Sequence, residues 1–282
     1  MAVPAAPAAC EATPRHWETV ARHWRQLGPP LRPSAEDVAF YTDAIQRWSG
    51  SGCAPRALIL GVTPELYRLP WPAGANVLAT DQTQDMIDAV WPGPRGAVVR
   101  ADWKALPLGD SSRDVVLCDG GLQLLAYPHG LQELAASLRR VIAPGGIFIV
   151  RLFVPPAAHE SPATVLADLL AGRVASTNHL KLRLGMALHE DARRGVGLRQ
   201  VWDALHCVAP DLQLLAAQLG WPPEHLLAIN TYRDRQTRYH FPELSALCEC
   251  FCTVPCGFAL ERTYLPTYEL GERCPTVVLR RQ

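Results

Sequence analysis

The amino-acid sequence predicts an α/β protein built around a doubly wound, mainly parallel sheet. Two observations support this fold class: short apolar runs recur from residue 57 onward, and helical stretches separate them. Runs that are apolar throughout are typical of strands covered on both faces, and strands that alternate with helices run parallel because each crossover returns the chain to the same edge. The expected strands are ALILG at 57–61, NVLATD at 76–81, AVVRAD at 97–102, DVVLCD at 114–119 and GIFIVRLF at 146–153.

Two N-terminal helices are expected within residues 15–50, after an Ala/Pro-rich segment at 1–14 that we expect to be disordered. The first helix, at about 15–27, ends where a Gly-Pro-Pro sequence stops it. The second begins at Ser34, whose hydroxyl can cap the helix, with Asp37 three residues later as the acid of a capping box.

The core domain is expected at 51–154, where helices at 83–90 and 131–142 connect the strands. The second of these helices is followed by Pro144-Gly145-Gly146. This sequence predicts a turn that leads into the next strand.

Residues 155–240 interrupt the alternation of strands and helices and contain no convincing strand. We therefore expect them to form a helical lid inserted into the core domain. Residues 241–282 then offer a helix from Pro242 and two strand-like runs, FALERTY and TVVLRRQ, which we expect to complete the sheet as a hairpin. The helical periods of the lid lie at about 163–171, 177–192, 197–208, 211–219 and 223–232.

Composition excludes several classes of partner. The 282 residues carry a formal net charge of zero, so no broad basic field favours nucleic acid. No uncharged apolar run approaches the ~20 residues that span a bilayer, and the N-terminus does not resemble a signal peptide. The nine cysteines are scattered, as is typical of a reduced, cytoplasmic protein. We expect a small-molecule substrate; the sequence carries no signal for an oligomeric state.

Three acids end three successive expected strands: Asp81, Asp102 and Asp119. Ligands of open α/β sheets bind outside the carboxyl ends of the strands. Asp81, about 20 residues after Gly61, is placed to accept both hydroxyls of a ribose. Asp102 can take the exocyclic amine of adenine while Trp103 packs on the base. Each acid alone would more readily be interpreted as a helix N-cap, but three in order at this spacing favour a nucleoside site.

The same segments resemble the successive motifs of class I S-adenosylmethionine-dependent methyltransferases over about 57–153. The matching motifs are LILGVTPEL, ATDQTQDMI, ADWKALPL, DVVLCDGGLQLL and LRRVIAPGGIFIVRLF. The resemblance implies a Rossmann-like, seven-stranded sheet with an antiparallel last strand, and S-adenosyl-L-methionine as cofactor. The cofactor-binding residues that it implies are Gly61, Thr63, Asp81, Gln82, Asp102, Trp103, Asp119, Gly120 and Gly121.

The cofactor loop departs from the usual pattern because it contains one glycine, in Gly61-Val62-Thr63-Pro64-Glu65. S-adenosylmethionine has no phosphate, so one glycine for close approach can suffice, with Thr63 offering a hydroxyl. The same loop argues against a nicotinamide dehydrogenase, which needs several glycines for its pyrophosphate.

A looser resemblance extends to a bacterial subgroup of these enzymes with a helical insertion. Some relatives of similar layout close the cofactor on itself to an azetidine ring and release methylthioadenosine. The segments concerned are GPPLRPS, RLFVPP, NHLKLRLGMAL, RYHFPEL and ERCPTVVLR.

The lid and the loop after the fourth strand supply the candidate substrate and catalytic residues. A histidine beside tyrosines can act as a general base, although each residue alone could be an ordinary surface, capping or turn group. The predicted catalytic residues are Tyr127, His129, Asn178, Tyr239 and His240. Further candidates for substrate contact are Lys181, Arg183, Tyr232 and Arg233, and Trp17 and Trp24 are candidates to line a substrate cleft.

Four cysteines, at 248, 250, 252 and 256, lack the spacing of paired zinc knuckles. We expect them to be small buried hydrophobic residues, and we expect no metal site.

The sequence therefore predicts an S-adenosylmethionine-dependent methyltransferase that acts on a small molecule, because a closing lid suits an enclosed acceptor. Two alternatives stay open at this point. One is an intramolecular S-adenosylmethionine cyclase, and the other is a methyltransferase-like scaffold without catalytic activity.

Overall fold

A computed structural model of the chain describes residues 20–50 and 52–282. The expectations for the segment 1–14, for Trp17 and for the start of the first N-terminal helix lie outside these residues. The described end of that helix finishes as a 3-10 turn, η1 (Trp24–Gln26).

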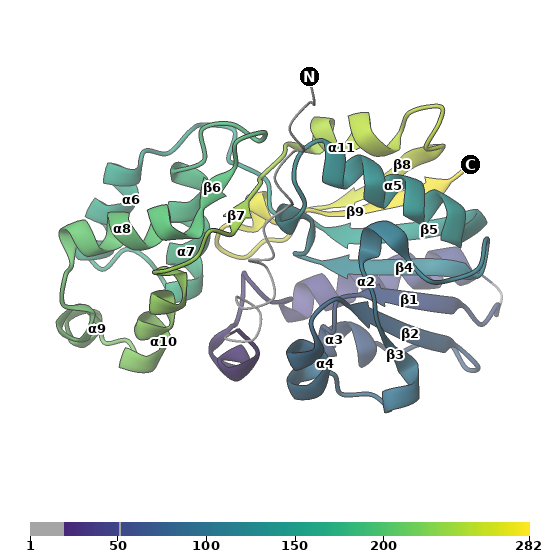
Figure 1. The fold of residues 1–282 in the computed structure, drawn as a ribbon, viewed down its shortest axis with the longest axis horizontal. Coiled ribbons are helices and arrows are strands. Elements are labelled where there is room, and N and C mark those ends of the chain that lie inside the picture. Colours follow the sequence, from purple (N-terminus) through teal and green to yellow (C-terminus); the bar gives the residue numbers. More distant parts are fainter. Residues whose placement is uncertain (1–19, 51) are drawn as a thin grey trace, which may run out of the picture.

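A seven-stranded sheet with the strand order β3-β2-β1-β4-β5-β9-β8 forms the centre of the molecule (Figure 1). β1 to β5 run parallel, and β9 is antiparallel to both of its neighbours. The predicted doubly wound sheet, with its C-terminal hairpin, is therefore confirmed. The strands are β1 (Arg56–Leu60), β2 (Asn76–Asp81), β3 (Val98–Arg100), β4 (Arg113–Asp119), β5 (Ile142–Arg151), β8 (Phe258–Tyr264) and β9 (Thr276–Arg281).

Helices cover both faces of this sheet. On one face α2 packs its buried Tyr41, Ala44 and Ile45 against the strands, together with residues of α3. On the other face α5 and α11 pack against a second apolar cluster. The helices of the core are α2 (Ala35–Ser49), α3 (Pro64–Tyr67), α4 (Gln84–Val90), α5 (His129–Val141) and α11 (Leu244–Phe251). Four 3-10 turns accompany them, η2 (Arg95–Ala97), η3 (Trp103–Ala105), η4 (Leu122–Leu124) and η6 (Gly271–Arg273).

Local signals place several of these elements. The Ser34–Asp37 capping box at the start of α2 is confirmed, with both reciprocal hydrogen bonds present. The predicted turn at Pro144-Gly145-Gly146 instead lies inside β5, which already pairs with β4 at Ile142. The register between the two strands shifts there, because Arg113 pairs with Ile142 and Val115 with Ile147. The extra residues are thus absorbed as a bulge rather than as a separate turn.

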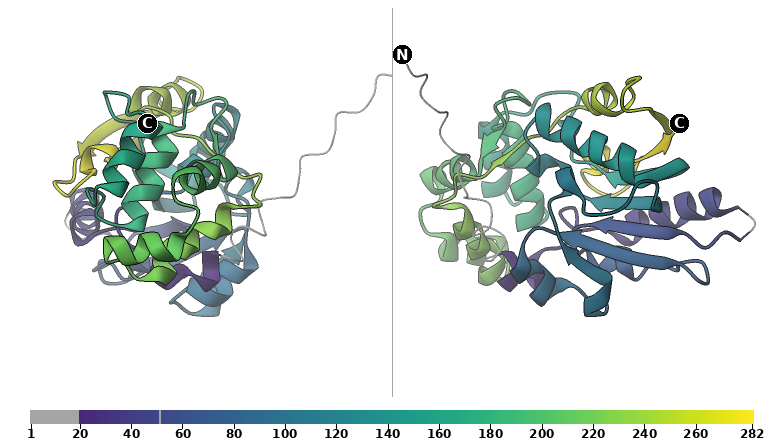
Figure 2. Two further views of the ribbon diagram at one scale, coloured as in Figure 1. Left: turned by 90° about the vertical axis from the view of Figure 1, so that its left-hand side faces the viewer. Right: turned by 45° about the vertical axis from the view of Figure 1, so that its right-hand side comes forward.

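Residues 155–240, hereafter the helical insertion, stand between β5 and the C-terminal hairpin at the carboxyl ends of the parallel strands (Figures 1 and 2). The insertion also contains a two-stranded ribbon that the sequence did not reveal, because each of its strands is two residues long. Its elements are α6 (Pro162–Leu170), α7 (Thr177–Ala187), β6 (Val196–Gly197), α8 (Leu198–Val208), α9 (Leu212–Leu219), α10 (Pro223–Leu227), η5 (Ala228–Tyr232) and β7 (Arg238–Tyr239).

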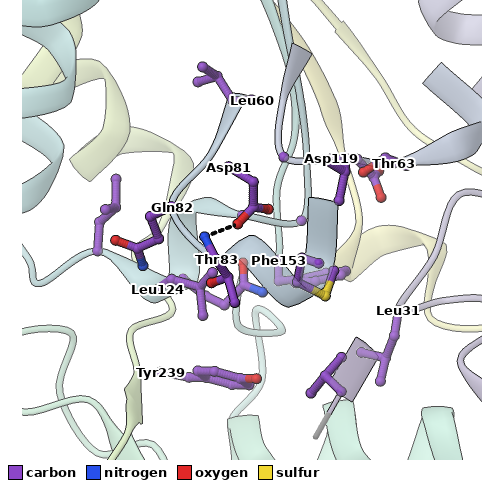
Figure 3. A pocket seen from close by; sticks show the side chains of 18 of the residues that line it. Leu31, Leu60, Thr63, Asp81, Gln82, Thr83, Asp119, Leu124, Phe153 and Tyr239 are labelled. Atoms are coloured by element: carbon purple, nitrogen blue, oxygen red, sulfur yellow. Dashed lines mark hydrogen bonds between the residues drawn. The ribbon is translucent and has the colours of Figure 1, made fainter. Parts of the chain in front are cut away.

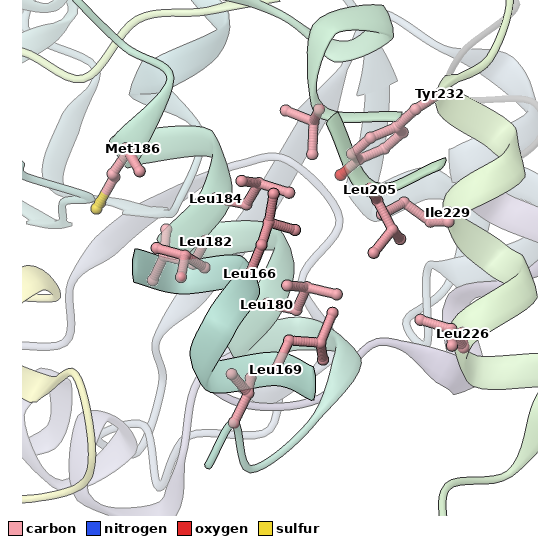
Figure 4. Packing of buried hydrophobic residues seen from close by; sticks show 14 of the residues in the cluster. Leu166, Leu169, Leu180, Leu182, Leu184, Met186, Leu205, Leu226, Ile229 and Tyr232 are labelled. Carbon is pink, nitrogen blue, oxygen red and sulfur yellow. The ribbon is translucent and has the colours of Figure 1, made fainter. Parts of the chain in front are cut away.

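The insertion has an apolar cluster of its own, which is built largely from leucines (Figure 4). Leu180, Leu182 and Leu184 of α7 are all buried, and so are Leu205 of α8 and Ile229 of η5. Because neighbouring positions of α7 are buried all round the helix, this helix forms the centre of the insertion. Packing against α6 and α8 therefore holds α7 in place within the insertion.

A buried ion pair joins the carboxyl ends of β4 and β5. The Arg151 side chain is fully buried, and its Nε and Nη2 donate to the two carboxylate oxygens of Asp119 at 2.5 and 3.1 Å. Its Nη1 donates to the carbonyl oxygen of Pro30 at 2.7 Å and lies 4.0 Å from the carboxylate of Asp37. This bidentate geometry satisfies the guanidinium in a place that water does not reach.

The hydroxyl of Tyr41 adds α2 to the same network. It donates to the carbonyl oxygen of Cys118 at 2.7 Å and accepts from the backbone N–H of Arg151 at 3.1 Å. The network therefore joins α2, β4, β5 and the segment that precedes α2.

Replacing Arg151 by Met should lower the free energy of unfolding by about 3–5 kcal/mol, because the Asp119 carboxylate would stay buried without its counter-charge. Urea unfolding followed by circular dichroism measures this loss. The matched control is Arg47→Met, which removes an exposed ion pair with Asp43 and should cost less than about 1 kcal/mol. Equal stability of the Arg151→Met and Arg47→Met proteins would contradict the assignment.

Candidate functional site

A cavity of about 600 Å³ lies at the carboxyl ends of β1, β2 and β4, between the sheet and the helical insertion (Figure 3). Its lining comes mainly from the strand-end loops, the start of α5, the helical insertion with the adjoining Phe241, and residues 20–34 before α2, hereafter the N-terminal strip. All of the predicted cofactor residues are among its lining residues, namely Gly61, Thr63, Asp81, Gln82, Asp102, Trp103, Asp119, Gly120 and Gly121.

The loop after β1 makes a sharp turn at Gly61. The residue has a φ of +93°, which a side chain would strain, and its N–H donates to the carbonyl oxygen of Thr80 at 2.7 Å. Thr63 occupies the N-cap position of α3 without a side-chain capping hydrogen bond, and it is buried. The loop thus brings backbone close to the cavity without needing a second glycine.

Asp81, at the end of β2, is the acid of this site that has no ion-pair partner among residues 20–50 and 52–282. Its Oδ1 accepts the backbone N–H of Thr83 at 2.8 Å, as Figure 3 shows. Burial raises the pKa of this carboxyl to about 6, although the hydrogen bonds from Thr83 oppose the shift. The carboxylate is therefore an acceptor held in place at a partly dehydrated position.

Trp103 holds the strand-end loops together. Its Nε1 donates to the carbonyl oxygen of Thr80 at 3.1 Å. A Cβ added at Gly121 would lie 2.8 Å from its ring, so this glycine is required for the close approach. Asp102, just before it, accepts the backbone N–H of Lys104 at 2.9 Å and is exposed, which is the ordinary N-cap arrangement.

Asp119 lines the cavity, yet Arg151 engages both of its carboxylate oxygens. Burial raises its pKa, and the Arg151 guanidinium opposes this shift. The next residue, Gly120, has a φ of +56°, and a Cβ there would lie 2.8 Å from the ring of Phe153. The two glycines after Asp119 are thus fixed in position by side chains on either side.

The predicted catalytic residues fall into two groups. His129, which begins α5, and Tyr239 of β7 line the cavity, and Figure 3 shows Tyr239 on the side opposite Asp81. Tyr127, Asn178 and His240 are not among the lining residues.

Packing accounts for these three positions. Tyr127 packs against the apolar cluster beneath α5, with the guanidinium of Arg193 5.9 Å from its ring. The Nδ1 of His240 lies 2.8 Å from the carbonyl oxygen of Ala192. The backbone N–H of His240 donates to the carbonyl oxygen of Gln123. Asn178 donates to the carbonyl oxygen of Gln26 at 3.5 Å, so it connects α7 to the N-terminal strip.

The N-terminal strip contributes lining residues that the sequence did not reveal. His23, Gln26, Leu31 and Arg32 face the cavity, together with the predicted Trp24. The Arg32 guanidinium forms an ion pair with Glu65 of α3 and lies 4.9 Å from the Trp24 ring. These contacts join residues far apart in sequence, and no local pattern signals them.

Lys181 and two tyrosines form the part of the wall that the insertion supplies. The Nζ of Lys181 lies 5.5 Å from the ring centre of Tyr232, and the hydroxyls of Tyr232 and Tyr239 hydrogen bond to each other. Burial lowers the pKa of Lys181 to about 8 and raises that of Tyr232 to about 12. This wall therefore presents an ammonium and two hydroxyl groups, which the tyrosine rings surround with apolar surface. The remaining two candidates from the lid, Arg183 and Arg233, are not among the lining residues.

Metal ligands are not gathered anywhere in residues 20–50 and 52–282: no three His, Cys, Asp or Glu side chains there are placed to hold an ion. Over the same residues, no helix is both long and apolar enough to cross a membrane. The four cysteines near α11 are free. The expectation that they are buried holds for Cys250 but is wrong for Cys248, Cys252 and Cys256, which are only partly buried: Cys252 and Cys256 lie at the edge of the cluster beneath the helix, and Cys248 lies outside it.

Comparison with known proteins places a methyltransferase domain at residues 59–150, which match that family model. No curated protein sequence matches the chain.

Three solved structures illustrate what the fold is similar to. A proposed Zn-dependent alcohol dehydrogenase from Rhodobacter sphaeroides is 14% identical, with a TM-score of 0.60 over 98% of this chain and 100% of that one. The PH0226 protein from Pyrococcus horikoshii OT3 is 13% identical, with a TM-score of 0.50 over 92% of this chain and 99% of that one. An S-adenosylmethionine-dependent methyltransferase from Mesorhizobium loti is 17% identical, with a TM-score of 0.44 over 85% of this chain and 96% of that one. The first two likenesses support the fold.

Asp81→Asn should stabilise the protein without ligand at pH 7.5. The folded-state pKa of about 6 lies above the ordinary 3.8, so stability contributed by the protonated acid is lost as pH rises from about 4 to 6. Asparagine removes this penalty and keeps an oxygen for the Thr83 N–H. We expect a gain of about 1–3 kcal/mol in urea unfolding at pH 7.5, which shrinks toward pH 4. A loss of stability at pH 7.5 would show that the burial argument is wrong.

Proposed function

We propose that this chain is a class I enzyme that transfers the methyl group of S-adenosylmethionine to a small molecule; the match of residues 59–150 to a methyltransferase domain and the seven-stranded sheet support this. The observation that carries the proposal is one shared cavity. The predicted cofactor residues of the sheet and apolar residues of the insertion line the same 600 Å³.

The residues present fit an adenosyl group. Asp81 is an acceptor without an ion-pair partner in the described chain, and two ribose hydroxyls would donate to it. Gly61 allows close approach of the loop, the Trp103 ring lies next to it, and Gln82 lines the same cavity. The backbone around Gly120 and Gly121 would face the methionine portion, because Asp119 itself is engaged with Arg151.

Enclosure supports a small acceptor. The N-terminal strip and the insertion both line the cavity on the side away from the sheet, and apolar side chains dominate there. They include Leu27 and Leu31 of the strip and Leu182 of the insertion, and Phe153 after β5 and Phe241 after β7 line the same cavity. A polymer chain would need a wide open groove, whereas a mainly apolar cavity of this volume suits one small substrate.

S-adenosylmethionine supplies a methyl group that its sulfonium already activates. The protein then has to align the attacking atom and exclude water, which can contribute roughly 7–11 kcal/mol. His129 is the histidine of the predicted catalytic set that lines the cavity, so we assign it the removal of the acceptor proton. Tyr239 stays neutral because burial raises its pKa, and it would orient the acceptor as a hydrogen-bonding group.

Binding of S-adenosylmethionine should depend on Asp81 and on pH. Isothermal titration at pH 7.5 should show at least tenfold weaker binding by Asp81→Asn, because an ionised acceptor holds hydroxyls more strongly than a neutral one. For the wild type, Kd should rise about tenfold from pH 7.5 to pH 5, as Asp81 takes up a proton below its pKa of about 6.

The control for this titration is Asp88→Asn, on the exposed side of α4, where Asp88 forms an ion pair with Arg95. It should bind as tightly as the wild type, and Asp81→Asn should show no comparable dependence on pH. Equal binding by the wild type and Asp81→Asn would refute the site.

The reaction itself is tested by mass spectrometry of the by-product from S-adenosylmethionine. Methyl transfer gives S-adenosylhomocysteine when an acceptor is supplied, and His129→Gln should slow its formation at least tenfold. Methylthioadenosine formed without any acceptor would instead identify a cyclase. Binding without either product, across a panel of small acceptors with oxygen, nitrogen, sulfur and carbon nucleophiles, would indicate a non-catalytic scaffold.

A further inference from the structure

Lys181 has an unusual place for a lysine of this chain. The sequence contains two lysines, Lys104 and Lys181, and otherwise uses arginine for its strong bases. Lys104 is partly exposed, with 38% of its side-chain surface accessible, whereas Lys181 is 9% exposed at the centre of the insertion and lines the cavity. A cation in such a place normally has a partner, because it is unfavourable to remove an unpaired charge from water.

The other strong bases that line the cavity are all paired. Arg32 forms an ion pair with Glu65, and Lys104 lies 3.3 Å from the carboxylate of Glu133. Lys181 has no ion pair with any residue in 20–50 or 52–282, and its ammonium lies over the ring of Tyr232. Arg183, also on α7, is by contrast paired with both Glu160 and Asp168.

The surroundings of Lys181 are aromatic and apolar. The ring of Tyr232 lies beneath its ammonium, and Tyr239 hydrogen bonds to Tyr232. Phe153 and Phe241 line the same cavity. The acids Asp81 and Asp119 lie on the opposite side from Tyr239 in Figure 3. The cavity therefore has carboxylates on the side of the sheet and the ammonium of Lys181 on the side of the insertion.

We propose that the methyl acceptor is a small aromatic carboxylate and that Lys181 is the counter-ion of its carboxylate group. The inference rests on the proposed function, because it assigns the acidic side of the cavity to the cationic methyl donor. A carboxylate completes the ion pair that Lys181 lacks, and the rings of the wall pack on an aromatic body.

The environment of the free protein supports this assignment. Burial is the cause that lowers the pKa of Lys181 to about 8, and no neighbouring charge contributes. The ring of Tyr232 lies 5.5 Å from its ammonium, and burial raises the pKa of both Tyr232 and its hydrogen-bond partner Tyr239, so both tyrosines are neutral. A carboxylate within about 4–6 Å of the ammonium would raise the pKa of Lys181 by about 1–3 units.

Lysine NMR tests the proposal directly, because a protein labelled with ¹³C at Cε of lysine gives two signals. Lys181→Met identifies the signal of Lys181, and the signal of Lys104 serves as an internal control. The probes are benzoate and its neutral analogue benzamide, each added to the full chain with S-adenosylhomocysteine present.

We expect Lys181 to titrate near pH 8 with benzamide and at least one pH unit higher with saturating benzoate, while Lys104 does not change. Benzoate should also bind at least tenfold more weakly to Lys181→Met, and benzamide equally to both proteins. Loss of benzoate affinity should appear in the wild type as pH rises above 8, where Lys181 loses its charge in the free protein.

Three outcomes would overturn the proposal. Benzoate that does not bind saturably, or that binds without moving the Lys181 signal, excludes an aromatic carboxylate at this position. A shift of the Lys181 pKa by S-adenosylhomocysteine alone would make Lys181 the counter-ion of the cofactor carboxylate instead. Titration of S-adenosylmethionine against Asp81→Asn tests the proposed function separately, so either idea can fail while the other stands.

Discussion

The structure depends most on the buried pair between Arg151 and Asp119. Two charges can be buried away from water only when their polar atoms have hydrogen-bond partners. Here Nε and Nη2 of Arg151 donate to Asp119, and Nη1 donates to the carbonyl oxygen of Pro30. The pair therefore fixes the ends of β4 and β5 and holds the N-terminal strip against them. The strip forms one wall of the cavity, so the same contact that stabilises the core also shapes the site.

This constraint changes the meaning of the strand-end acids. Asp119 has both oxygens engaged by Arg151, and Asp102 is an exposed N-cap, so neither is a free acceptor buried at the site. Their loops still matter, because Trp103 fits against Gly121 and hydrogen bonds to Thr80. The three loops thus hold one another in place, and Asp81 alone keeps a carboxylate without an ion pair among the described residues that line the cavity.

The sequence predicted the sheet and the strand-end residues because both depend on local patterns: apolar runs of strand length, and an acid or glycine at the end of each run. It did not predict Arg32 and Leu31 on the cavity wall, since those positions result from the packing of residues far apart in the chain. His240 and Asn178 illustrate the same limit. Both are polar residues in the expected segment, but backbone carbonyl groups of neighbouring segments engage them.

The cavity carries one unpaired acid on the sheet, Asp81, and one unpaired base on the insertion, Lys181, within the described chain. Burial disfavours the charged form of each, so both side chains reduce the stability of the protein without ligand. Replacing Asp81 by Asn, or Lys181 by Met, would make the protein without ligand more stable. Two separate ligands of opposite charge would offset both costs at once, since each would bring the partner that the chain does not provide. The polarity of the cavity therefore favours a cationic donor and an anionic acceptor bound side by side in one site.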